Sequence, residues 1–460
     1  MNFVYSRRDF LRVSTQTAVS AALASTLGGL RRVAAATADA GGYKALVCLY
    51  LTGGNDGFNT VVPLTPAGYS LYAQTRTNLA LPSGALLPLN GTASDGYIYG
   101  LHPSCPELQS LFNAGNAAIL SNVGTLVQPT TPAQVKAGAI PVPPQLFSHF
   151  DQVTQWQTSI ANSPRKYGWA GRMADLYVSQ GTKPNLSMNV EIGGPNYWQQ
   201  GTATNPYTLG VNGAPIMDDT TNNYRGGLRA KTALALLSQA SNDDNLLVSQ
   251  FSAVENSAAS KVTMVNNAYS AVGDLATPFP AYDQDSALGA QFHAVARLIK
   301  ARSQIGDARQ IFFVNMNGFD SHQNQLSDQA RNLRILSQNV QTFWAAMGEI
   351  GMQNNVTLFT ASEFGRSLGS NGSGADHAWG SHHLILGGAV QGGKYYGKMP
   401  VLKIGGPDDI NATSGQIVPT TSTDQYAATL ASWFGVAAGD LPALFPNLKN
   451  FATPTLGFLG

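Results

Sequence analysis

The chain has 460 residues, of which 43% are hydrophobic and 12% charged, and its formal net charge is +1. This balance gives no basic patch for nucleic acid and no charged tail, while the apolar content is ample for a large core. The two cysteines, Cys48 and Cys105, form no CxxC pair. A disulfide between them is permitted in an oxidising compartment, but we expect buried free thiols.

The first 38 residues have the features of an export signal. Residues 6–12 (SRRDFLR) form a twin-arginine motif, residues 13–30 are mildly apolar, and residues 34–38 (AAATA) are small. This is the order of a secretory signal, with cleavage expected just after Ala36 or Ala38. A transmembrane helix needs about 20 strongly apolar residues, and this stretch is rich in Ala, Ser and Thr. We therefore expect the twin-arginine translocation machinery as a partner, a periplasmic or secreted location, and no transmembrane segment in the mature chain.

Continuous apolar runs alternate with helical patterns along the rest of the chain. The runs predict strands buried on both faces, at residues 45–51, 117–123, 310–315, 356–361 and 383–388. Apolar residues at helical spacing predict helices at residues 106–114, 288–302, 326–350 and 424–434. The alternation predicts one α/β domain over residues 39–460, a three-layer α/β/α sandwich with a mostly parallel central sheet. Residues 224–280 are predicted to form a helical insertion, and residues 125–144 and 195–224 long loops.

Chemically useful side chains follow three of these predicted strands. Asp56 lies in a glycine-rich turn after the first strand. Asp320 and His322 come after the strand at 310–315, and Glu363 comes directly after the next one. In open α/β sheets, ligands bind at the carboxyl ends of the strands. We therefore expect these four side chains at one edge of the sheet.

A histidine-rich loop, residues 374–383 (GADHAWGSHH), leads into the last predicted strand. Imidazole is the commonest metal ligand and acid–base group near neutral pH. His382 and His383 point to opposite faces if they lie in a strand, so at most one of them is expected to bind a metal. Asp376 could orient a histidine without binding the metal itself. The loop is close enough in sequence to join the same edge.

Carboxylates and imidazoles together suit zinc, manganese, iron or magnesium. Two ions about 3.5–4 Å apart would hold the attacking and leaving oxygens of a displacement. The sequence therefore predicts one or two divalent metal ions. The candidate ligands are Asp56, Asp320, His322, Glu363, His377 and His382, with His383 as an alternative to its neighbours.

Each of these candidates has a structural alternative. Asp56 could be a turn residue or a helix N-cap that binds backbone N–H groups. Glu363 and Arg366 could form an ion pair, and Asp320 with His322 could be an ordinary turn that caps a helix. No motif decides alone, and the expectation of a metal site depends on their joint placement.

Another polar cluster lies at residues 147–151 (FSHFD). Ser148 and His149 could supply a nucleophile, a base or a further metal ligand. The alternative is that Ser148 is the N-cap of the following helix, with Asp151 in a capping-box-like position.

These motifs together resemble an exported bacterial family known as domain of unknown function 1501. The resemblance covers nearly all of the mature chain and rests on the twin-arginine signal and on LTGGNDGFNT, SHFD, GFDSHQNQ, SEFGR, DHAWGSHH, DQYAATLASWFG and FPNL. The family in turn resembles a distant branch of the alkaline phosphatase and sulfatase superfamily. That resemblance implies an alkaline-phosphatase-like sandwich with metal ligands at the strand ends.

The superfamily pattern implies roles for individual residues. Asp56 would match the first-strand aspartate that contacts metal, and Ser148 would match the nucleophile. Asp320 and His322 would match a carboxylate and a histidine of the first metal. Glu363 stands where an Asp-His pair is usual, and His377 or His382 would match the late histidine. The sequence departs from the superfamily in the spacing of Asp320 and His322, in having Ser-Glu for Asp-His, and in lacking the sulfatase Cys/Ser-x-Pro-x-Arg signature.

The leading hypothesis is an exported metal-dependent hydrolase of phosphate or sulfate esters, acting on a small-molecule or polymer substrate. Ser148 is the candidate nucleophile, His149 a base, and Arg366 a bidentate anion binder. The main alternative is a non-catalytic exported binding protein on a degenerate phosphatase or sulfatase scaffold, because fold alone does not give function. A metal-containing redox protein is a further alternative.

Overall fold

The computed structural model describes residues 42–162, 167–214, 245–280 and 287–460. The predicted export signal and the first part of the predicted insertion lie outside the described residues. No helix in the described ranges is long and apolar enough to cross a membrane.

The described residues contain a nine-stranded sheet in which β1 (Lys44–Leu51) lies between β8 (Arg309–Met316) and β9 (Val356–Ala361). On the side of β9 follow β10 (Ser381–Leu386) and then β5 (Ala117–Gly124). On the side of β8 follow β6 (Asn189–Glu191) and then β7 (Tyr207–Thr208). Two short strands, β11 (Tyr395–Tyr396) and β12 (Thr421–Ser422), both pair with β5. β10 is antiparallel to β5 and β9, while all other pairs in this sheet are parallel. The predicted mostly parallel sheet is confirmed.

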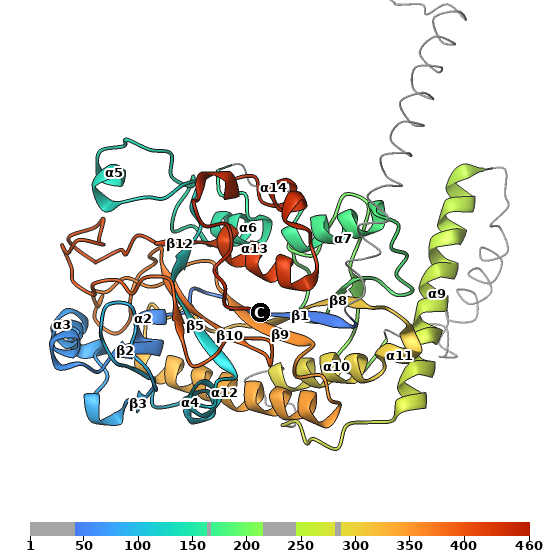
Figure 1. Ribbon diagram of the computed structural model, residues 1–460, viewed down its shortest axis with the longest axis horizontal. Coiled ribbons are helices and arrows are strands. Elements are labelled where there is room, and N and C mark those ends of the chain that lie inside the picture. The colour runs from blue at the N-terminus through green and yellow to red at the C-terminus, as the bar shows by residue number, and fades with distance from the viewer. Residues whose placement is uncertain (1–41, 163–166, 215–244, 281–286) are drawn as a thin grey trace, which may run out of the picture.

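Helices cover both faces of this sheet, which gives three layers (Figure 1). One face carries α4 (Pro106–Asn113), α10 (Leu288–Lys300) and α12 (Gln325–Glu349). The other carries α6 (His149–Thr158), α7 (Trp169–Ser179), α13 (Thr423–Phe434) and α14 (Leu441–Leu444). The three-layer α/β/α sandwich expected from the sequence is therefore what the structure shows.

The alternation of side chains along β1 explains why residues 45–51 are all apolar. Val47 and Leu49 belong to one hydrophobic core, while Leu46, Cys48 and Tyr50 belong to the core on the other face. Successive strand residues point to opposite faces, and both faces are covered, so every position after Lys44 is apolar. Cys48 and Cys105 lie in different cores, and both are free thiols.

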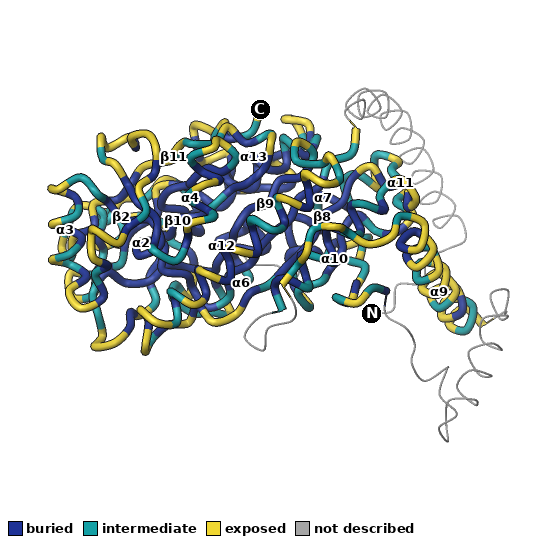
Figure 2. Tube along the Cα trace, turned by 90° about the horizontal axis from the view of Figure 1, so that it is seen from below, coloured by how far each residue is buried: buried dark blue, intermediate teal, exposed yellow. Residues whose placement is uncertain are grey.

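Smaller elements complete the described chain at the ends of the sheet. A three-stranded sheet of β2 (Val61–Pro63), β4 (Tyr99–Leu101) and β3 (Leu87–Pro88) lies at one end with α2 (Gly57–Thr60) and α3 (Pro66–Arg76). At the other end, α9 (Leu246–Val272) runs along the rim of the molecule, largely exposed (Figure 2). The remaining short elements are α5 (Pro132–Lys136), α11 (Arg302–Ile305), η1 (Thr77–Leu79), η2 (Ser83–Ala85), η5 (Ala438–Asp440) and η6 (Leu448–Asn450).

The direction of β10 decides where the histidine-rich loop lies. β1, β8 and β9 are parallel, so their carboxyl ends share one edge of the sheet. Because β10 runs the other way, its first residue, Ser381, lies at that same edge. The loop that precedes β10 therefore meets the segments that follow the three parallel strands.

Candidate metal centre

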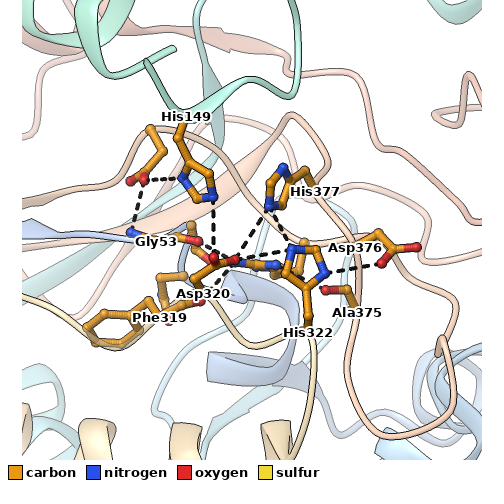
Figure 3. Close-up of polar contacts among 12 residues, drawn as sticks. Gly53, His149, Phe319, Asp320, His322, Ala375, Asp376 and His377 are labelled. Carbon is orange, nitrogen blue, oxygen red and sulfur yellow. Dashed lines mark hydrogen bonds and ion pairs between the residues drawn. The ribbon is translucent and has the colours of Figure 1, made fainter. Parts of the chain in front are cut away.

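The carboxylate of Asp320 lies among three histidine rings (Figure 3). The Nε2 atoms of His149, His322 and His377 are 3.5, 3.3 and 3.4 Å from its oxygens. The Nε2 atoms of His322 and His377 are 2.9 Å apart. Ligand atoms of His149, Asp320 and His377 all lie within 4.8 Å of one another. One carboxylate and three imidazoles therefore converge on one place, and we call these four residues the histidine–aspartate cluster.

The other ring nitrogen of each histidine contacts an oxygen that can only accept a hydrogen bond. These contacts join His149 Nδ1 to Glu363 Oε1 at 2.9 Å, His377 Nδ1 to the Phe147 carbonyl at 2.8 Å, and His322 Nδ1 to Asp376 Oδ1 at 3.3 Å. A histidine that binds a metal usually donates its second N–H in this way, which fixes the ring and its tautomer. The expectation that Asp376 orients a histidine agrees with its contact to His322.

The Nδ1 contacts place the lone pairs of the neutral rings inside the cluster. If Nδ1 carries the hydrogen, Nε2 of a neutral imidazole is an acceptor. His322 and His377 then present two acceptors to each other at 2.9 Å, beside the Asp320 carboxylate. Two ring nitrogens at this distance are held together either by a cation between them or by a hydrogen on one of them. The donor set fits a divalent ion bound by nitrogen and oxygen.

Glu363 lies behind His149 and outside the cluster itself. It is buried, and its Oε1 accepts from both His149 Nδ1 and the backbone nitrogen of Gly53, each at 2.9 Å. Gly53 is required here because a Cβ at this position would overlap the backbone of Phe319 and Asp320. Glu363, predicted as a metal ligand, is therefore placed as an orienting residue for His149.

Arg366 is fully buried beneath the cluster and does not face solvent. It donates to Asp320 Oδ1 at 2.6 Å and to backbone carbonyls at the ends of β1 and β8 and in the loop before β10. These contacts tie three segments together and fix the carboxylate of Asp320. The expectation that Arg366 binds an anionic substrate group does not agree with this placement, because its donors are directed at the protein.

The electrostatics of the cluster favour an ionised Asp320 carboxylate beside a neutral His377 imidazole. Partial burial raises the pKa of Asp320, but the hydrogen bond and charge of Arg366 outweigh it and hold that pKa below its usual range. Desolvation lowers the pKa of His377. The hydrogen bond to Glu363 raises the pKa of His149. The His149 ring lies between the carboxylates of Glu363 and Asp320.

A cleft with a volume of about 460 Å³ opens beside the cluster. His149, Asp320 and Glu363 form its polar floor. The rest of its lining consists of small, polar and aromatic residues: Thr52, Gly53, Phe150, Val153, Thr154, Tyr197, Asn317 and Gly318. A ligand in the cleft would therefore touch two members of the cluster.

Comparison with known families identifies the chain. Residues 43–441 match the family described as "Protein of unknown function (DUF1501)". The chain belongs to this family. The resemblance inferred from the motifs is thus confirmed, and no curated protein matches the sequence.

Solved structures with a related arrangement are ester hydrolases and a synthase. The PsFucS1 sulfatase from Pseudoalteromonas sp. is 12% identical, with 91% of this chain and 72% of that chain covered and a TM-score of 0.34. The lipoteichoic acid synthase LtaP from Listeria monocytogenes is 7% identical, with 86% and 73% covered and a TM-score of 0.34. The phosphonate monoester hydrolase of Agrobacterium radiobacter is 10% identical, with 85% and 74% covered and a TM-score of 0.32. The likeness is distant, so the chemistry of this family member depends on its own residues.

Asp56 does not join the cluster in this member of the family. It is buried as the N-cap of α2, and its Oδ1 accepts from the backbone nitrogens of Phe58 and Asn59 at 3.1 Å. Its Oδ2 forms an ion pair with buried Arg76 and accepts from Gln325. The N-cap alternative is the one that the structure shows, and the metal role that the superfamily pattern implied for Asp56 has no geometric support.

His382 and His383 also lie away from the cluster. The two side chains occupy opposite faces of β10. His382 Nδ1 accepts a hydrogen bond from the backbone nitrogen of Asn122 at 3.1 Å. The ring of His383 lies beside Trp156, and its Nδ1 is 3.3 Å from Thr360 Oγ1. The expected opposition of the two side chains is correct. The expected metal contact of His382 is not found, because both rings are buried in the core.

These two buried histidines should make the protein sensitive to acid. Desolvation lowers the pKa of each to about 3, whereas an unfolded histidine titrates near pH 6.5. The folded state keeps both rings neutral, so their stabilising contribution is complete above about pH 6.5 and is lost as the pH falls toward 3. We expect about 2 kcal/mol of unfolding free energy to be lost per histidine between pH 6.5 and 5. Denaturant titrations of His382→Gln should show a smaller loss than the wild type; parallel losses would contradict this assignment.

Ser148 is the N-cap of α6. Its Oγ accepts from the backbone nitrogen of Asp151 and donates to Asp151 Oδ2 at 2.6 Å. This is the N-cap alternative weighed from the sequence. The cap starts the helix at His149, which places that ring, rather than the serine, in the cluster. This placement of His149 is compatible with the metal-ligand role that the sequence had left open beside those of nucleophile and base.

Proposed function

We propose that the protein is an exported metal-dependent hydrolase of phosphate or sulfate esters. The observation that carries the proposal is the pair of facing Nε2 atoms of His322 and His377, 2.9 Å apart beside the Asp320 carboxylate. The cleft next to this pair provides space for a substrate. The twin-arginine pattern at the N-terminus supports export.

The described ligands suit one ion rather than two. His149, His322 and His377 each approach the one carboxylate of Asp320, whereas Asp56 and His382, the further candidates, are engaged elsewhere. Three imidazoles and one carboxylate are typical of zinc and also accommodate manganese. When bound, such an ion polarises an ester oxygen and lowers the pKa of an attacking water.

The protein's own residues keep this site in order. Arg366 holds the carboxylate of Asp320, and Glu363 holds the His149 ring with its Nε2 toward the cluster. The hydroxyl of Ser148 is engaged by Asp151, so the proposal assigns the attack to water rather than to a serine.

A non-catalytic metal-binding protein is the second candidate. Among the described residues that line the cleft there is no lysine, arginine or serine. The described lining therefore has no lysine or arginine to bind a doubly charged phosphate, and its only hydroxyl groups are those of Thr52, Thr154 and Tyr197. This candidate shares the metal site but predicts no turnover.

Removal of the metal tests both the hydrolase and the metal-binding protein, because each requires a bound ion. Protein purified from the periplasm should contain about one divalent ion per chain, and a chelator should remove it together with hydrolysis of phosphate or sulfate esters. Stability should fall because ligand binding to the folded state adds free energy in proportion to RT ln(1 + [L]/Kd), about 2.7 kcal/mol at 100 times Kd.

Metal analysis, thermal unfolding and an ester screen with several added ions measure these effects. Restoration of both activity and melting temperature by one ion supports the hydrolase. Restored stability without hydrolysis of any tested ester supports the binding protein. Absence of a bound ion and of any chelator effect on stability contradicts both.

A further inference from the structure

An exposed aromatic side chain stands next to a candidate metal ligand. Phe150 follows His149 in the first turn of α6, is 72% exposed, and lines the cleft. Single exposed apolar side chains are common on protein surfaces, and what distinguishes Phe150 is its place in the lining of the cleft beside the cluster. Val153 and Thr154, three and four residues further along α6, line the same cleft. This spacing puts all three side chains on one face of the helix.

The cleft has the dimensions of a small-molecule site. Its volume of about 460 Å³ lies within the range of about 300–1,000 Å³ that ligand pockets occupy. Tyr197, in the loop after β6, adds a second aromatic ring to the lining. Gly53 and Gly318 also line the cleft and contribute no side chain to fill it. A flat group can therefore lie against Phe150 while an attached group reaches the cluster.

The charges around the cleft restrict what that flat group can be. The described lining holds the carboxylates of Asp320 and Glu363 and no lysine or arginine. Arg366 is fully buried and bonded to protein oxygens. Additional anionic groups on a ligand would meet carboxylates without a cation to compensate them. The cleft therefore disfavours polyanions and favours uncharged rings.

We propose that the cleft binds an uncharged ring, stacked on Phe150, as the alcohol part of the ester that the cluster hydrolyses. An aromatic ring and the apolar face of a sugar ring share this chemistry. The inference rests on the proposed function and names its substrate class. Hydrolysis adds water across the P–O or S–O bond, and the ring alcohol leaves with a proton as phosphate or sulfate is released. The free ring alcohol is accordingly a ligand of the cleft even without turnover.

Binding of ring alcohols tests the proposal independently of catalysis. Phenol serves as the aromatic probe, methyl glucoside as the sugar probe, and ethanol as the probe without a ring, each titrated into the purified protein by ligand-observed NMR. Phe150→Ala should weaken binding of the preferred ring about 3- to 10-fold, since stacking adds to buried area. Phe150→Tyr should restore most of it, and metal content should not change.

Phe251→Ala is the matched control. This phenylalanine is also exposed, at 47%, but it belongs to α9 and does not line the cleft. Ring binding should be unaffected by its removal. The comparison separates loss of a specific stacking contact from a general loss of exposed apolar surface.

Hydrolysis of matched esters separates failure of this inference from failure of the proposed function. Phenyl or glucosyl esters should be cleaved with a higher kcat/KM than the ethyl ester of the same acid, and Phe150→Ala should remove that preference by raising KM. Ester hydrolysis with equal kcat/KM for ring and ethyl esters, insensitive to Phe150→Ala, would overturn the ring site and leave the hydrolase standing. Ring binding that depends on Phe150 in a protein that cleaves no ester would overturn the hydrolase and keep the ring site. Tighter binding of a sulfated polysaccharide than of either uncharged ring would overturn the inference.

Discussion

Asp320→Asn is expected to abolish metal binding and, with it, ester hydrolysis. Asp320 supplies the only carboxylate of the histidine–aspartate cluster. Its amide replacement would carry no negative charge to balance a divalent ion. Even residues that only orient a metal-binding histidine typically contribute about 10–100-fold to affinity, so loss of a ligand should cost more than about 100-fold. Metal content after dialysis and titration of the metal-free protein with zinc or manganese measure the effect.

Asp376→Asn is the matched control for this experiment. Asp376 contacts only His322 within the cluster, through Nδ1 at 3.3 Å, and its side chain is half-exposed. Its replacement should weaken binding by no more than about 10–100-fold. Circular dichroism of both variants checks that they fold. If Asp320→Asn retains a full equivalent of metal, Asp320 is not a ligand and the site as described is wrong.

Asp56→Asn should produce a large loss of stability and leave metal affinity unchanged. The side chain of Arg76 is fully buried, and Asp56 is its carboxylate partner. Removing one partner of a buried ion pair typically costs about 3–5 kcal/mol, because it leaves an uncompensated buried charge. The hydrogen bonds to the first turn of α2 weaken as well. Denaturant unfolding and metal titration, performed on the same preparations, measure the two effects.

Asp328→Asn provides the comparison for an exposed carboxylate. Asp328 forms an ion pair with Arg331 on the surface of α12 at 3.7 Å, with both side chains exposed. Exposed pairs contribute about 0–1 kcal/mol, so this variant should resemble the wild type. Loss of metal by Asp56→Asn without loss of stability would instead support the metal role that the superfamily resemblance implied for Asp56.

The fold could be predicted largely from its central strands. β1, β5, β8 and β9 are buried at nearly every position, so each contains an apolar run that stands out from the rest of the sequence. The short strands could not be predicted in this way. β6 has three residues and β11 two, and such pieces form only because a neighbouring strand already offers its hydrogen-bonding edge.

The candidate site could be predicted in part. Asp320, His322 and His377 were expected from their positions next to predicted strands, and the structure brings all three together with His149. Asp56 and Glu363 occupy equivalent positions at strand ends but serve as an N-cap and as the support of His149. The end of a strand determines the position of the backbone at a residue. The hydrogen-bond and ion-pair partners of its side chain determine whether that side chain faces the cluster or the core.

The sequence by itself determined the strand–helix alternation, the edge at which polar residues gather, and the membership of the family. These features depend on which residues are buried and on which residue types form turns, and both can be inferred from the types and spacing of neighbouring residues. Only the tertiary structure decided that β10 runs antiparallel, that α6 begins at His149, and that Arg366 is turned inward. Each of these depends on contacts between segments far apart in the chain. Such contacts result from the packing of the whole sheet and its helices, and no local pattern encodes them.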